Sequence, residues 1–172
     1  DELDNDCDGA RDEDTVVAGE LVITETFADP QASSTTWMEV VNPGTTTVDL
    51  VWLTLLVDGR ASPLPSGWLG PGELLLLCDD DDDSTNGGLG CDGRIDLPDG
   101  ARTFVLEGPA GLIVDEVDQT RWSLTPGRAL ELGAGNLDAS TNNDEAAWCT
   151  GVSLFGDDSG DRGTPGALLP PC

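Results

Sequence analysis

From Gly19 onward, apolar and polar residues alternate with the period of β-strands, in short segments separated by Gly, Pro and Asn turn signals. About seven segments carry this pattern, and no long segment shows a helical repeat. They are Leu21–Thr26, Trp37–Val41, Val48–Val57, Glu73–Cys78, Thr103–Glu107, Leu112–Val117 and Ala129–Leu132. Short strands with such frequent turns predict an all-β protein, an antiparallel β-sandwich of immunoglobulin-like type.

Residues 1–18 lie outside the sandwich pattern, since no strand-like alternation precedes Val16. We therefore expect an Asp-rich, metal-binding-like segment over residues 1–18 and a β-sandwich domain over residues 19–172. No apolar stretch approaches the roughly 20 residues that span a bilayer, and no secretory signal remains. These features favour a chain that does not insert into membranes, either processed or trimmed to start at Asp1.

Acidic residues dominate the composition, with 34 Asp and Glu against seven basic residues, all of them Arg, and a formal net charge of -27. Carboxylate oxygens are the ligands that hard divalent cations prefer, above all calcium. The same charge repels nucleic acid and anionic membranes, so we expect neither as a partner. A salt-adapted or very soluble secreted protein would show a similar surface, which leaves that alternative open.

The strongest local signal for Ca²⁺ is Asp4-Asn5-Asp6-Cys7-Asp8-Gly9, which matches the first half of a calcium loop. Its oxygen ligands alternate, and Gly stands at the sharp turn. The predicted ligands are Asp4, Asp6, Asp8, the main-chain carbonyl of Ala10, and Asp12. Thr15 replaces the expected bidentate Glu, so Glu13 or Asp14 has to substitute for it. The alternative interpretation is a solvated acidic tail.

A second acidic run, Asp79–Asp83, offers Asp79, Asp81 and Asp83 as weaker calcium candidates. Ser84 occupies the position where a calcium loop needs Gly, so a solvated loop is the favoured interpretation. The oxygen-rich loop around Asn136–Asp144 is likewise interpreted as turn chemistry rather than a metal site.

The five cysteines form no close zinc-type pairs, and the chain has no His to complete such a site. Disulfides in an oxidising compartment are the better interpretation. Locality favours Cys78 with Cys91 and Cys149 with Cys172. Cys7 is then left over, for an intermolecular bridge, an upstream partner or a free thiol.

Catalysis finds little support, because the chain contains neither His as a general base nor Lys for Schiff-base chemistry. We expect no enzymatic activity. The tryptophans are expected to pack in the core or against disulfides rather than to form a sugar platform. They are Trp37, Trp52, Trp68, Trp122 and Trp148.

Five blocks of sequence stand out within residues 19–172: Gly19–Glu25, Trp37–Gly44, Leu112–Val117, Ala146–Cys149 and Gly160–Gly166. Taken together, these blocks resemble the bacterial lamin-tail domain. The chain departs from it at Thr24, where Asn is common, and the run Asp79–Asp83 looks like an insertion. The resemblance implies an immunoglobulin-like fold used for binding, anchoring or assembly in exported bacterial proteins, without enzymatic activity.

The same resemblance places Glu25, Glu39 and Asp115 in recurring strand motifs, where we expect them to accept hydrogen bonds from loop backbones. The N-terminal string is also similar to a DNDCDG-type motif of bacterial surface proteins, which is associated with metals and in some cases copper. Copper is disfavoured here because Met38 would be the sole soft ligand beside cysteine and no His is present.

These features favour a secreted or cell-surface, calcium-binding module with a structural or adhesive role in the cell surface or matrix. The main alternative is a subunit of an extracellular filament, joined to other copies of itself through the N-terminal segment by strand addition at Val16–Ala18 or through Cys7. A minor alternative is an accessory domain of an exported hydrolase.

If residues 1–18 form a calcium loop, calcium will protect them from limited proteolysis, because ligation orders the chain around the ion. Mass spectrometry of the digest with calcium and with chelator measures this protection. Calorimetry that shows no calcium binding even at millimolar concentration would contradict the prediction.

Overall fold

The computed structural model describes residues 16–31, 35–156 and 160–168, and over these ranges the chain is built from short β-strands and single 3-10 turns. The strands are β1 (Val22–Phe27), β2 (Trp37–Val41), β3 (Val48–Asp49), β4 (Thr54–Val57), β5 (Arg60–Pro63), β6 (Trp68–Leu69), β7 (Leu74–Cys78), β8 (Gly93–Arg94), β9 (Thr103–Glu107), β10 (Ile113–Asp118), β11 (Leu130–Leu132) and β12 (Trp148–Thr150). The 3-10 turns are η1 (Leu50–Trp52), η2 (Pro109–Gly111), η3 (Ala134–Asn136) and η4 (Glu145–Ala147). The all-β expectation is confirmed.

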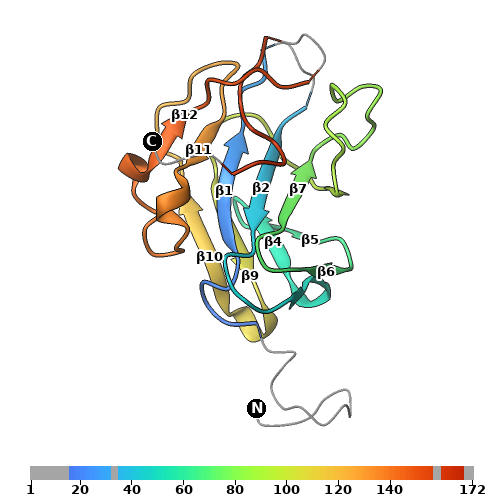
Figure 1. Cartoon of the computed structure of the whole chain (residues 1–172), viewed down its shortest axis with the longest axis vertical. Coiled ribbons are helices and arrows are strands. Elements are labelled where there is room, and N and C mark those ends of the chain that lie inside the picture. Colours follow the sequence, from blue (N-terminus) through green and yellow to red (C-terminus); the bar gives the residue numbers. More distant parts are fainter. Residues whose placement is uncertain (1–15, 32–34, 157–159, 169–172) are drawn as a thin grey trace.

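Two sheets face each other as a β-sandwich (Figure 1). The larger sheet has six strands in the order β12-β11-β1-β2-β7-β8, and the smaller has four in the order β10-β9-β4-β5. β3 and β6 form a third, two-stranded sheet, called the short ribbon below. The strand pairs are antiparallel, as expected, except for the short edge pair of β7 with β8, which is parallel.

The main core lies between the two sheets and takes its side chains from both. Ile23 and Val40 of the larger sheet and Leu55 and Leu106 of the smaller one are fully buried there. Val16 also packs into this core, and the main-chain N–H of Gly19 donates to the carbonyl of Val114. The residues just before β1 are therefore bound to the sandwich body.

The predicted strand Val48–Val57 is divided in the structure into β3, η1 and β4. The Asp49 side chain accepts a hydrogen bond from the N–H of Val51 and so caps the 3-10 turn. Leu50 turns into the core while Val51 and Trp52 are exposed. The Asp49 cap thus stabilises a turn where the apolar pattern predicts a continuous strand. The apolar pattern alone does not predict such a local side-chain hydrogen bond.

The outer face of the larger sheet is covered as well, so every residue of β1 is buried. A second, smaller core lies on this face and includes Phe27, Trp37 and Phe155. Their ring centroids are 5.1 to 5.7 Å apart, and Phe155 meets the other two rings edge-on. The chain that follows β12 therefore folds back over the sheet instead of leaving its outer face to solvent.

The tryptophans do not share one environment. Trp37 and Trp148 are buried, and Trp122 is partly buried beside Trp148. Trp52 and Trp68 are 57% and 64% exposed, so the expectation that all five pack inside is wrong for these two. Both belong to the region around the short ribbon, where two-residue strands and a 3-10 turn expose part of each segment.

Cys78 and Cys91 form a disulfide with a Cα–Cα distance of 6.1 Å, in agreement with the pairing that locality favoured. Cys149 is also disulfide-bonded. Its predicted partner Cys172 and the leftover Cys7 lie outside the described residues, so that pairing stays a prediction.

Replacing both Cys78 and Cys91 by Ala should lower the free energy of unfolding by about 3 kcal/mol, because the cross-link restricts a short loop in the unfolded chain. Urea denaturation of the oxidised protein and the double variant measures the difference. An unchanged midpoint and slope would show that the cross-link contributes nothing to stability.

Candidate functional site

The six predicted N-terminal calcium ligands lie outside the described residues. They are Asp4, Asp6, Asp8, Ala10, Asp12 and Asp14. Their assignment rests on the sequence pattern and stays a prediction.

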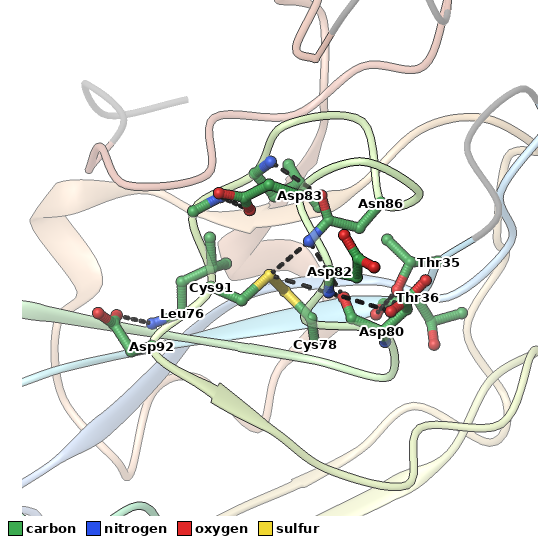
Figure 2. Close-up of a disulfide and its surroundings, with 12 residues drawn as sticks. Thr35, Thr36, Leu76, Cys78, Asp80, Asp82, Asp83, Asn86, Cys91 and Asp92 are labelled. Carbon is green, nitrogen blue, oxygen red and sulfur yellow. Dashed lines mark hydrogen bonds between the residues drawn. A yellow bond between two sulfur atoms is a disulfide. The ribbon is translucent and has the colours of Figure 1, made fainter.

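The second acidic run forms a compact turn rather than a strand, closed at its base by the Cys78–Cys91 disulfide (Figure 2). The Asp80 carboxylate accepts hydrogen bonds from the N–H of Asp82 at 3.1 Å and from the hydroxyl of Thr85 at 2.6 Å. Asp82 accepts from the N–H and hydroxyl of Ser84 in the same way. These bonds, with the side-chain hydroxyls contributing most, lower the pKa of Asp80 and Asp82.

The three alternating candidates of this run do not converge. Asp79 accepts from the N–H of Leu97 at 3.2 Å, and Asp83 accepts from the N–H of Gly90 at 3.0 Å. Asp81 is exposed. Within the described ranges no group of three or more His, Cys, Asp or Glu side chains is arranged to hold a metal ion. Calcium ligation by Asp79, Asp81 and Asp83 stays a prediction that this geometry does not favour.

The loop after β11 is held by buried amide and carboxylate groups. Asn142 is fully buried and its Nδ2 donates to Asp115 Oδ2 at 2.7 Å, while its main-chain carbonyl accepts from the indole N–H of Trp148. Asp115 also accepts from the N–H of Ile23 at 2.7 Å. Ile23 lies before the residues of β1 that pair with β11, so β11 offers no acceptor for its main-chain N–H. The Asp115 carboxylate, on β10, accepts this hydrogen bond instead. Asn142 thus ties the loop to β10 and β1. The turn chemistry that the sequence favoured is seen at Asp138 and Asp144, which accept from main-chain N–H groups two residues ahead.

A row of three glutamates crosses the outer face of the larger sheet. Glu25 of β1 lies directly opposite Glu39 of β2 on one side and Glu131 of β11 on the other. Each is no more than 2% exposed. The sequence motifs indicated Glu25 and Glu39 but not Glu131, although Glu131 lies within the predicted strand Ala129–Leu132.

The segment Gly163–Gly166 covers this row and supplies its hydrogen-bond donors; it belongs to the C-terminal stretch, red in Figure 1, that crosses over β1 and β2. The N–H of Thr164 donates to Glu25 Oε1 at 2.7 Å, and the N–H of Gly166 donates to Glu39 Oε2 at 2.6 Å. The Thr164 hydroxyl lies 3.0 Å from Glu25 Oε2 and 3.4 Å from Glu131 Oε1. The expected role of Glu25 and Glu39, accepting from loop backbones, is the role seen.

Close approach of backbone to carboxylate explains the Gly at position 163. A Cβ there would lie 2.7 Å from Glu25 Oε1 and 3.0 Å from the Trp37 ring. Such contacts are too short for a methyl group, so the segment can reach the glutamates only without a side chain at this position.

Burial dominates the titration of these carboxyl groups. It raises the pKa of Glu25 to about 9 and that of Glu39 to about 7, against the lowering effect of the main-chain donors. Burial raises the pKa of Glu131 as well. Glu131 lies opposite Glu25 across the strand pair, and its charge raises the pKa of Glu25 further. Desolvation likewise raises the pKa of Asp115 to about 7.

The glutamate row has no room for a ligand. The space among Glu25, Glu39, Glu131 and Thr164 does not admit a water molecule. The carboxyl groups accept hydrogen bonds from the C-terminal segment and hold it on the sheet.

Comparison of the chain with protein-family models, with curated proteins and with solved structures found no match. The lamin-tail resemblance and the DNDCDG-type motif therefore stay predictions from the quoted residues.

The raised carboxyl pKa values make stability depend on pH. Because the pKa of Glu39 in the folded state is about 7, above its ordinary value of 4.5, the folded state binds more protons than the unfolded state in this window. Stability should therefore fall as pH rises from about 5 to about 8. Glu39→Gln keeps an oxygen for the Gly166 N–H and has no charge to bury. Its free energy of unfolding at pH 8 should exceed that of the parent by on the order of 2 kcal/mol.

Urea denaturation across this pH range measures the effect, with Glu116→Gln, a half-buried glutamate on β10, as the charge-matched control. A Glu39→Gln variant that loses stability with pH as steeply as the parent would contradict the burial argument.

Proposed function

We propose that this chain is an extracellular, non-enzymatic module that binds calcium and serves a structural or adhesive role at the cell surface or in the matrix. The immunoglobulin-like character implied by the lamin-tail resemblance belongs to this proposal. The calcium-binding proposal rests on a division among the carboxylates. Some are buried and stabilise the fold, whereas others are exposed in turns that are closed by a disulfide or by Asp side-chain hydrogen bonds.

The exposed carboxylates support cation binding because hydrogen bonds keep them ionised. Hydroxyl donors lower the pKa of Asp118 and Asp138, as they do for Asp80 and Asp82. With a formal net charge of -27, these groups repel one another, and a bound divalent cation relieves that repulsion. Calcium fits the oxygen-only chemistry best, and the N-terminal Asp pattern is its proposed principal site.

The disulfides support an extracellular location, since such bonds persist in oxidising compartments. No helix within the described part of the chain has the length and apolar character needed to cross a membrane. The lack of His and Lys in the sequence supports a binding role rather than catalysis.

A filament subunit joined by strand addition at Val16–Ala18 receives less support. Val16 is buried in the core of its own sandwich, and the N–H of Val17 donates to Glu20 of the same chain at 2.9 Å. Strand addition through this segment would first have to displace those contacts. The single module is therefore the function that we put first.

Isothermal titration calorimetry of the oxidised full chain with CaCl₂ tests the proposal. Replacing Asp4, Asp6 and Asp8 together by Asn should weaken binding at least about tenfold, because each removes a charged ligand. The triple variant Asp79→Asn, Asp81→Asn, Asp83→Asn should change it little, since those side chains do not converge.

The control for general electrostatics is Asp99→Asn, Glu107→Gln, Glu116→Gln, which removes the same charge elsewhere. Equal weakening by all three triple variants would mean diffuse attraction and would overturn a specific site. Light scattering of the same samples with calcium and with chelator separates a monomeric module from a filament.

A further inference from the structure

Trp68 is the most exposed of the tryptophans and stands beside a cavity. In β6 it pairs with Asp49 of β3, and its neighbour Leu69 turns into the main core. Because side chains alternate along a strand, burial of Leu69 directs Trp68 outward, where it is 64% exposed. An indole fixed by a buried neighbour presents a rigid aromatic surface to solvent.

The cavity has a volume of about 630 Å³ and is lined by Trp68, Pro65, Ser66, Glu73 and Asp92, among other residues. The two carboxylates are positioned by main-chain donors. Glu73 Oε2 accepts from the N–H of Gly70 at 2.7 Å, and Asp92 Oδ2 accepts from the N–H of Leu76 at 2.8 Å. Among the described residues, no hydrogen bond is formed by the second oxygen of either carboxylate.

The cavity also borders a stretch of sheet edge that is unpaired among the described residues. Within the same ranges, β8 pairs with Leu77 and Cys78 of β7, and Asp92 bonds the main chain of Leu76. Main-chain groups two residues apart point to the same side of a strand, so the N–H and carbonyl of Leu74 face this edge. Leu74 itself lines the cavity. An extended peptide can therefore approach the cavity alongside β7.

Charge decides which occupant fits. The described lining residues include two acidic side chains and no Arg, on a chain whose formal net charge is -27. A neutral sugar would stack on Trp68 and donate hydroxyl groups to the carboxylates, but it would leave their charge unneutralised. A cation gains from the indole face and also neutralises the carboxylates.

We propose that this cavity binds a Lys or Arg side chain from an extended segment of a partner protein, held over Trp68 between Glu73 and Asp92. This deepens the adhesive role proposed above by assigning it a partner surface. It is independent of the calcium proposal, because the site uses neither the N-terminal segment nor the run Asp79–Asp83.

The test follows the tryptophan indole N–H signals of the ¹⁵N-labelled full chain by NMR. The protein is titrated in chelator with acetyl-Gly-Gly-Arg-Gly-Gly-amide and with the same peptide carrying Gln in place of Arg. The Arg peptide should shift the Trp68 signal saturably and leave Trp52, which is 57% exposed but does not line the cavity, unchanged. The Gln peptide should bind at least about fivefold more weakly.

Variants show which side chains bind the Arg peptide. Glu73→Gln with Asp92→Asn keeps the acceptors for Gly70 and Leu76 and should weaken Arg-peptide binding at least about fivefold. Asp99→Asn with Glu107→Gln removes the same charge elsewhere and should leave binding within about twofold. Trp68→Ala, at an exposed position, should weaken binding as the carboxylate variant does, and Trp52→Ala should not.

Equal binding of the Arg and Gln peptides, or equal loss in both charge variants, would overturn the proposal. So would a Trp68 signal that responds to a neutral oligosaccharide such as cellotetraose and not to the Arg peptide, because that outcome assigns a sugar site. Since calcium is absent throughout, each of these results leaves the calcium proposal standing.

Discussion

Three glutamates side by side on one sheet face, Glu25, Glu39 and Glu131, constrain the rest of this molecule. A carboxylate on a strand normally faces water, and burying it without donors costs several kcal/mol. Here the main-chain N–H groups of Thr164 and Gly166 supply those donors. The segment can therefore lie against the sheet, and the rings of Phe27, Trp37 and Phe155 extend the cover.

This cover explains why β1 is buried on both faces in a protein of modest size. The inner face packs against the smaller sheet, and the outer face packs against the returning chain. The same cover leaves no room for an ion among the glutamates. Their oxygens already have donors, their space admits no water, and burial favours the neutral carboxyl group.

Side-chain length distinguishes the Asp residues of the exposed turns from the Glu residues of the sheet, and buried Asp115, which accepts from distant residues, is an exception. The short Asp side chain reaches main-chain N–H groups two residues ahead, as Asp80, Asp82 and Asp138 do in exposed turns. The longer Glu side chains of the sheet reach across to a separate segment. The surface charge that remains is therefore carried largely by Asp in loops, which is the geometry that suits an oxygen-liganded cation and a basic partner alike.

Much of the fold follows from the sequence, because strand patterning and turn residues act locally. β2 and β9 agree with their predicted bounds, and the Cys78–Cys91 disulfide agrees with the locality of its cysteines. The short strands β5, β6, β8 and β12 were missed, because strands this brief or this polar depend on neighbours to pair with.

The residues themselves thus determined the all-β class, the excess of carboxylates and the local disulfide, since each depends on composition or on nearby positions. Only the tertiary structure decided which carboxylates are buried. The pairing that sets Glu131 beside Glu25 joins strands that are far apart in the chain. The segment that covers both side chains contains Thr164 and lies still further along the sequence. It also decided that Trp37 is enclosed while Trp68 faces solvent, because exposure depends on what the chain brings over each ring and not on the ring's own hydrophobicity.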